Sequence, residues 1–369
     1  MMMLAALLLG VGTAGCTADD RQADRASVSE GPAIVALLTD RSLVRVATTT
    51  GAVLARMRIG PRSSPPNSGR FLALTPDGGT LFVLTPGAAS VAQVVAVVDP
   101  EMLQVRSRIS VPAEIIFRAL VVGPASGRLY LFGNRPVARG RGAEDAVIAI
   151  VDPTRSADIR TWTIRDAEGH DWWVFDAAVS GDESRLYVSY HGGCSENFAL
   201  CTSGADWLDA DGGELTRCRR PSLPANGCIS RVHGGIEMVG NRFLATTGAA
   251  PILEIQGGRI ATRWKTRLAG NHVMEFAVDS MRDQAYVVGQ CYYVGGVSLV
   301  DIRSGQTRVL TRDVCGDRVA VGSNLVAVAE QVQAAPQAVP SRIALISRTG
   351  RAVRYVSLPL EVLDLAFVP

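Results

Sequence analysis

The sequence carries almost no excess charge of either sign. Its 369 residues contain 37 Lys and Arg against 35 Asp and Glu, which gives a formal net charge of +2. A nucleic-acid binder needs a strongly basic surface, so we expect no nucleic-acid partner. Lysine is nearly absent: Lys265 is the only one. We attribute this preference for arginine to genome composition rather than to function. Hydrophobic residues make up 47% of the chain, which is too many for a disordered protein.

Long apolar runs are missing except at the N-terminus. Residues 1–15 are uncharged and rich in Met, Leu, Ala and Gly. This run is too short to span a membrane but has the length of a signal-peptide hydrophobic region. Residues 13–16 (Thr-Ala-Gly-Cys) resemble a bacterial lipobox, in which Cys16 becomes the lipidated first residue. Two departures leave plain secretion or a cytoplasmic chain open: Thr13 stands where Leu is usual, and no basic residue precedes the run.

These features predict three segments. We expect a signal peptide over 1–15, a lipidated Cys16 with a polar tether over 16–32, and a folded domain over 33–369. The protein is then exported and lipid-anchored to a bacterial cell membrane on its extracytoplasmic side.

Cysteine usage agrees with export. The six cysteines other than Cys16 form an even set with paired spacings, which is typical of disulfides in an oxidising compartment. They are Cys194 and Cys201, Cys218 and Cys228, and Cys291 and Cys315. Sequential pairing rests on proximity alone, because six cysteines allow fifteen connectivities. No C-x-x-C spacing supports a zinc finger.

Sequence signatures of catalysis are absent as well. The chain has no G-x-S-x-G elbow, no H-E-x-x-H, no P-loop and no G-x-G-x-x-G after a strand. We therefore name no catalytic residue.

What the sequence does contain is a repeat of two hairpins. A strand, a tight turn and a second strand recur, with the second strand marked by one residue per copy: Val35, Phe82, Tyr130, Tyr187, Leu244, Tyr286 and Val326. A second hairpin follows, with an Asp at its turn, as in Val98-Asp99-Pro100 and Val151-Asp152-Pro153. The markers are 40 to 57 residues apart, and repeats of about 40 to 50 residues are typical of propellers. Seven markers predict an all-β, seven-bladed β-propeller of four-stranded antiparallel blades; a repeated barrel and a parallel β-helix are the alternatives.

The first copy lacks its inner strand, and the chain end has a spare one at residues 362–368. We expect the C-terminal strand to complete the first blade, because closure removes open sheet edges.

The segment Pro76-Asp77-Gly78-Gly79-Thr80-Leu81-Phe82-Val83 and the following Val98-Asp99-Pro100 resemble the repeat of the YVTN-type propellers. These are bacterial extracytoplasmic proteins related to WD40-like and lactonase-type propellers. The resemblance covers about residues 33–369 and implies a fold, not a catalytic residue.

In such a ring the long connections share one face, which we call the loop face. All four histidines fall there, and His170, His233 and His272 precede inner strands, which converge on a central channel. With Asp171 or Glu275 they form a candidate ligand set for a divalent metal such as zinc, although solvated or hydrogen-bonded loop histidines are the favoured explanation. Arg118, Asp176, Glu275 and Asp364 occupy similar inner-strand slots and are expected to line the channel.

We therefore expect a surface-anchored binding module rather than an enzyme, attached to the membrane by its lipid, with a protein or extracellular ligand on the loop face. No cofactor is predicted beyond the candidate metal. The alternative is a metal-assisted, lactonase-like hydrolase at the channel mouth. The candidate ligand-binding residues are His170, Asp171, His233, His272, Glu275 and Arg118.

Overall fold

The structure is a computed structural model. It describes residues 31–60, 69–85, 92–136, 144–155, 158–164, 172–183, 186–192, 202–204, 235–239, 242–246, 251–256, 259–265, 273–289, 295–330, 341–350 and 353–369. The predicted signal peptide, Cys16 and the tether up to residue 30 lie outside these residues. The fold below is that of residues 31–369.

All secondary structure in the described residues is β-strand, as predicted. The innermost strands are β27 (Val362–Val368), β4 (Leu72–Leu74), β8 (Ile116–Val122), β12 (Trp172–Val179), β15 (Ile236–Val239), β19 (Val273–Asp279) and β23 (Arg318–Val321). The second strands are β1 (Ala33–Leu38), β5 (Leu81–Leu84), β9 (Leu129–Pro136), β13 (Leu186–Gly192), β16 (Arg242–Thr246), β20 (Gln284–Gly289) and β24 (Leu325–Glu330).

Two further sets of strands lie outside these. The third strands are β2 (Ser42–Ala47), β6 (Val94–Asp99), β10 (Glu144–Val151), β14 (Thr202–Gly204), β17 (Pro251–Gln256), β21 (Gly296–Asp301) and β25 (Arg342–Ser347). The outer strands are β3 (Val53–Arg58), β7 (Gln104–Ser110), β11 (Ile159–Ile164), β18 (Arg259–Lys265), β22 (Thr307–Thr311) and β26 (Val353–Ser357).

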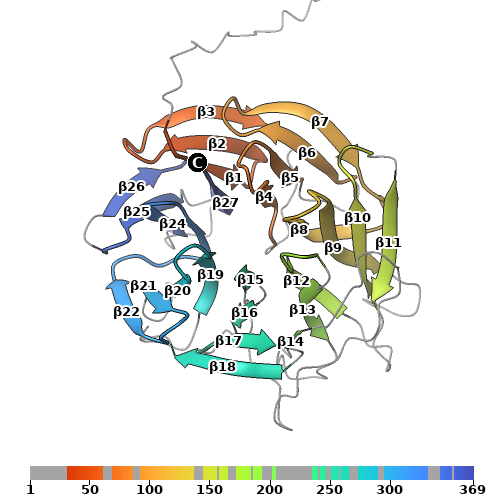
Figure 1. Ribbon diagram of the computed structural model, residues 1–369. Helices are drawn as coiled ribbons and strands as arrows, with labels where there is room; N and C mark the ends of the chain where they lie inside the picture. The colour runs from red at the N-terminus through yellow and green to blue at the C-terminus, as the bar shows by residue number, and fades with distance from the viewer. Residues whose placement is uncertain are drawn as a thin grey trace, which may run out of the picture. The chain divides into compact units, whose positions relative to one another are not determined.

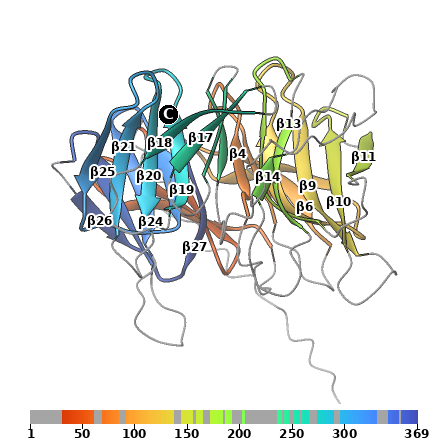
Figure 2. The ribbon, with the colours of Figure 1, turned by 90° about the horizontal axis from the view of Figure 1, so that it is seen from below.

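These strands form seven antiparallel sheets, which stand around one axis as blades (Figures 1 and 2). Blade 1 is β27-β1-β2-β3, and blades 2 to 7 follow in chain order. Six blades have four strands, whereas the described part of blade 4 has three, β12-β13-β14. Every predicted marker falls on a second strand. Each copy of the predicted hairpin therefore corresponds to the two inner strands of one blade.

Blade 1 is closed by the chain end, as predicted. Strand β27 pairs antiparallel with β1, with Ala33 opposite Val368 and Leu37 opposite Asp364. All six residues of β1 are buried. The N-terminal strands therefore have their inner edge covered by the last residues of the chain.

The repeated residues have structural roles. Asp99 and Asp301 end third strands, and Asp152 directly follows one. Each accepts a hydrogen bond from a backbone N–H group two or three residues later. These are Asx-type turns, which fix the reversal into the outer strand. The hydroxyl of the marker Tyr130 donates to Glu183 of blade 4 at 2.9 Å, so a marker also joins neighbouring blades.

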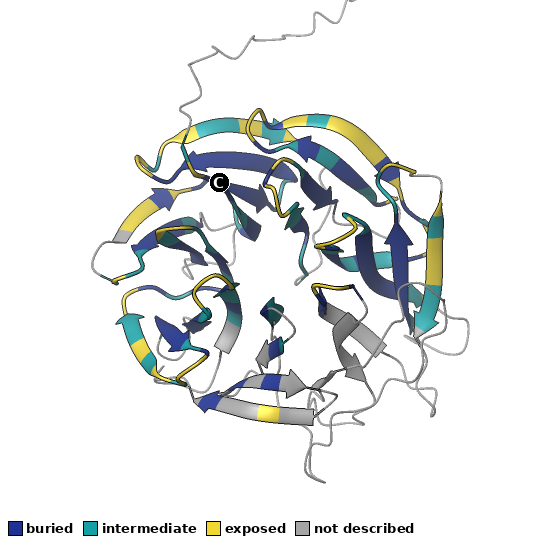
Figure 3. Ribbon diagram, viewed as in Figure 1, coloured by how far each residue is buried: buried dark blue, intermediate teal, exposed yellow. Residues whose placement is uncertain are grey.

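The hydrophobic core lies between blades rather than in one centre. One cluster joins blades 1, 2 and 3, and smaller ones join blades 3 and 4, 5 and 6, 6 and 7, and 7 and 1. Burial is greatest in the second strands, such as β1 and β5, and lowest in the outer ones, where exposed residues of β3, β7 and β11 face solvent (Figure 3). Over the described residues, no helix has the length and apolarity needed to cross a membrane.

Candidate functional site

Charged side chains gather at one level of the inner strands, near the start of most of them and at the middle of β12. We call six of them the axial cluster: Arg70, Asp176, Glu237, Glu275, Arg318 and Asp364. They come from blades 2, 4, 5, 6, 7 and 1 respectively. The ring thus brings together residues that are far apart in sequence.

A repeated irregularity sets the level of three carboxylates. In four inner strands, pairing with the second strand slips by one residue at the same height. The residues directly after the slip are Asp364, Ala119, Asp176 and Glu275. Such bulges re-aim the side chains that follow them. Gly235 lies between two of these carboxylates, since a Cβ built on it is 3.6 Å from Asp176 Oδ2 and 3.6 Å from Glu275 Cγ.

Arg70 links opposite sides of the ring. Its Nη2 donates to Asp176 Oδ2 at 3.1 Å and to Glu237 Oε1 at 2.8 Å. Its backbone forms an isolated parallel bridge with Ala119 of blade 3. Because blades 2 and 5 are not neighbours, the guanidinium reaches across the axis and ties four blades together.

Arg318 closes the other side of the cluster. Its Nη1 donates to Glu275 Oε2 at 3.0 Å, and its Nε donates to the carbonyl of Leu363 at 2.7 Å. Asp364, the next residue of β27, accepts the backbone N–H groups of Phe71 and Leu72 at 2.7 and 2.8 Å. The closing strand is therefore held by both of its neighbouring blades.

The axial cluster has four carboxylates and two guanidinium groups, so acid is in excess. Burial raises the pKa of Glu275 to about 8, which the ion pair with Arg318 opposes and the carboxylates of Asp364 and Asp176 reinforce. Burial also raises the pKa of Glu237 above its usual range, against the pull of Arg70. At neutral pH the cluster therefore keeps a proton on Glu275, which removes one of its negative charges.

The structure places only some of the predicted site residues. Glu275 lies in the axial cluster beside Arg318, and Asp176 and Asp364, expected along the channel, lie there too. Arg118 stands at the slipped position itself, one residue before the carboxylate level. The others, His170, Asp171, His233 and His272, lie outside the described residues, as do all the predicted disulfide cysteines except Cys315. Within the described residues, no group of three or more His, Cys, Asp and Glu is placed to hold a metal ion.

Sequence reasoning missed three members of the cluster, Arg70, Glu237 and Arg318. A signal was available, because each lies within two residues of the start of an inner strand. The repeat is faint in blades 5 and 7, and blade 2 has a short inner strand. The sequence therefore did not show how the inner strands of these blades align with those that carry the carboxylates.

The closed ring of seven antiparallel sheets defines the class of the protein, a seven-bladed β-propeller. No protein-family model matches the chain, and no curated protein matches it. Solved structures do share the fold. A functionally unknown protein from Desulfotomaculum acetoxidans has a TM-score of 0.62 at 13% identity, with 91% of this chain and 98% of that chain covered.

Two structures of named proteins also share the fold. The periplasmic gluconolactonase PpgL of Pseudomonas aeruginosa has a TM-score of 0.60 at 15% identity, covering 92% of this chain and 99% of its own. AztD from Citrobacter koseri has a TM-score of 0.51 at 14% identity, covering 91% and 97%. Such low identities establish a shared fold and transfer no activity.

Proposed function

We propose that this chain is an extracytoplasmic β-propeller that acts as a binding module, held at a bacterial membrane by a lipid on Cys16. The observation that favours a binding module over an enzyme is that the charged groups of the axial cluster are engaged with one another and with the backbone. The cluster's guanidinium and carboxylate groups bind one another and the backbone of neighbouring blades, from the 2.7 Å bond of Phe71 N–H to Asp364 to the 3.1 Å bond of Arg70 to Asp176. Side chains engaged in this way fix the blades and leave recognition to the outer surfaces.

The anchor is supported by the sequence alone. Residues 1–15 have signal-peptide character, and residues 13–16 resemble a lipobox. A diacylated cysteine holds a protein stably, whereas a single acyl chain does not. The +2 net charge adds little electrostatic attraction to anionic lipid.

Fractionation of cells that express the full chain tests the anchor. Wild-type protein should sediment with membranes and resist washing with high salt, and Cys16→Ala should be released or remain unprocessed. Wild-type protein in the soluble exported fraction, with a mature start other than Cys16, contradicts the anchor and favours plain secretion.

The binding role needs its own test. Detergent-extracted full-length protein, immobilised, should retain a component of the protein or polysaccharide fractions of a bacterial envelope. Retention from neither fraction contradicts the binding module.

A lactonase-like hydrolase is the second candidate. It is favoured by the fold shared with a gluconolactonase and by Glu275, whose raised pKa keeps a proton beside Arg318 at neutral pH, as a general acid requires. Hydrolysis of gluconolactone by the full chain, lost in Glu275→Gln but kept in the exposed-turn variant Glu101→Gln, would favour the hydrolase. Equal rates with and without protein favour the binding module.

A further inference from the structure

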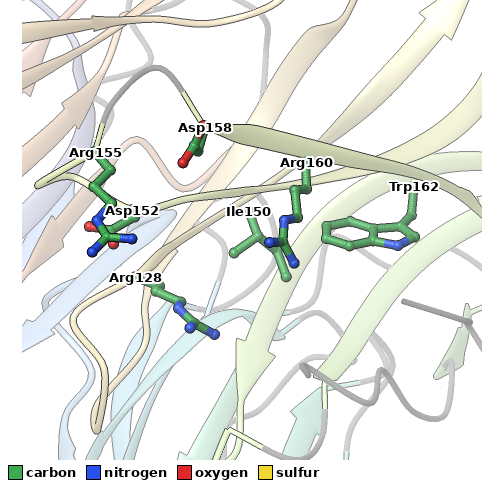
Figure 4. A pocket seen from close by; sticks show the side chains of 7 residues that line it. All are labelled: Arg128, Ile150, Asp152, Arg155, Asp158, Arg160 and Trp162. Carbon is green, nitrogen blue, oxygen red and sulfur yellow. The ribbon is translucent and has the colours of Figure 1, made fainter. Parts of the chain in front are cut away.

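A hollow on blade 3 lies away from the axial cluster. It measures about 160 Å³ and is formed by the β8–β9 turn, the β10–β11 turn and the facing parts of β10 and β11 (Figure 4). Its side chains are Arg128, Ile150, Asp152, Arg155, Asp158, Arg160 and Trp162. Because both turns are tight reversals within the blade, this site opens at the end of the ring opposite to the axial cluster.

Strand alternation explains why a ring and a guanidinium share this site. Arg160 and Trp162 are two residues apart on β11, so they lie on the same face of the blade. They stand opposite Ile150 and Ile148 of β10, whose side chains belong to the core between blades 3 and 4. Trp162 packs against this core and is half-buried, while Arg160 is exposed. Figure 4 shows Arg160 between Ile150 and Trp162.

The charges of the hollow are mixed but unequal. Arg128, Arg155 and Arg160 carry three positive charges, and Asp152 and Asp158 carry two negative ones, so the sum is +1. Asp152 is held in place by Thr154, whose N–H and Oγ donate to its Oδ1 at 2.9 and 2.6 Å. These hydrogen bonds hold the pKa of Asp152 below its usual range, so it stays ionised.

We propose that this hollow binds one acidic sugar unit, a hexose ring that carries a single carboxylate. The inference rests on the proposed binding function and names its ligand class. Arginine matches a carboxylate with two parallel hydrogen bonds. The flat face of a tryptophan provides an apolar surface for a ring, and aspartates accept hydrogen bonds from sugar hydroxyls.

Size and charge select this ligand over others. The volume is below the ~300–1,000 Å³ of sites for drug-sized molecules, which limits the occupant to about one ring. A net charge of +1 matches a monoanion. A phosphorylated sugar brings about two negative charges toward two aspartates, and a neutral sugar offers the arginines no carboxylate.

Titration calorimetry of the full chain with D-glucuronate tests the proposal, with D-glucose and glucose 6-phosphate as comparisons. Wild-type protein should bind glucuronate at least about 10-fold more tightly than glucose, which is the factor expected for one charge-assisted hydrogen bond. Glucose 6-phosphate should bind more weakly than glucuronate.

Variants locate the site. Arg160→Gln and Trp162→Ala should each weaken glucuronate binding by about 10-fold or more. Arg106→Gln replaces an exposed arginine on β7, the outer strand of blade 2, and should leave binding unchanged. Because Trp162 packs on the core, the melting temperature of Trp162→Ala is measured as well, and Arg160→Gln keeps the test decisive if that variant unfolds.

Three results overturn the inference. Glucuronate that does not bind wild-type protein at tens of millimolar refutes the acidic-sugar site, while retention of envelope material in the preceding test leaves the binding function standing. Binding unchanged in Arg160→Gln places the ligand elsewhere. Equal affinity for glucose and glucuronate refutes the role of the arginines.

Discussion

Glu183 in the first turn of blade 4 holds blade 3 through one carboxylate. It accepts hydrogen bonds from the N–H groups of Ala125 and Ser126 at 2.8 and 2.5 Å. The hydroxyls of Ser126 and Tyr130 donate to its other oxygen at 2.5 and 2.9 Å. Its side chain is buried, with 7% of the residue exposed. These four bonds join two blades that also share an apolar cluster.

Replacing this residue by glutamine keeps its volume but removes the charge. The amide retains one acceptor oxygen and directs an NH2 group at donors, so about two of the four bonds are lost. Hydrogen bonds to charged groups contribute ~1.5–3 kcal/mol each. We expect Glu183→Gln to lower the free energy of unfolding by about 3 kcal/mol at pH 7, measured from the midpoint of urea denaturation.

The pH dependence gives an independent test of the same bonds. Burial works to raise the pKa of Glu183, but the hydrogen bonds from Ser126, Tyr130 and Ala125 outweigh it, and the net pKa is lowered from 4.5. A carboxyl with a depressed folded pKa stabilises fully above its unfolded pKa and loses that contribution as pH falls through the folded value. The difference between wild type and Glu183→Gln should therefore be complete at pH 7 and shrink below about pH 4.5.

Glu101→Gln, on an exposed turn of blade 2, is the matched control. It should change stability by less than about 0.5 kcal/mol. A loss below 1 kcal/mol in Glu183→Gln, or a loss that is the same at pH 7 and pH 3, would show that the carboxylate does not hold the two blades together.

Three further outcomes are expected. Deleting residues 360–369 should expose the inner edge of β1 and remove Asp364, so the truncated protein should melt at a clearly lower temperature and aggregate; equal melting and solubility would contradict closure by the chain end. Arg70→Met leaves two carboxylates without their guanidinium and should cost about 3 kcal/mol in urea unfolding, at the lower end for a buried pair because the side chain is 21% exposed; no change would contradict its bridging role. The raised pKa of Glu275 means that, above about pH 4.5, the folded state holds a proton that the unfolded state releases. The free energy of unfolding should therefore fall as pH rises from 4.5 toward about 8. Glu275→Gln should flatten that pH dependence, measured by thermal melts.

The fold could be predicted from the repeat, because the repeat consists of features that are local in the sequence. Tight turns, marker residues and the Asp at the second turn are local, and the spare strand at the chain end had one open place to fill. Blade 4 shows the limit, since the part of its third strand that the structure describes is only Thr202–Gly204, within a long insertion where the repeat pattern is weakest.

The axial cluster was harder because its members meet only through the ring. Arg70 and Glu237 are 167 residues apart, and nothing near either one indicates the other. Their contact depends on how many blades close the ring and on a one-residue slip in the inner strands. The hollow on blade 3 is more local, yet it combines the first turn with the outer hairpin, and sequence patterns treat those as separate.

The pairing of β27 with β1 also sets the order in which this protein can be completed. Strand β1 precedes the other six blades in the chain, whereas its partner β27 follows them. Until residues 362–368 emerge, six apolar residues present an unpaired edge, and a sheet edge of this kind pairs readily with another chain. The long sequence separation also makes closure slow compared with hairpin formation. The period of greatest risk for this protein is therefore the time between making its first blade and sealing it, and a chaperone that shields β1 would act on that interval.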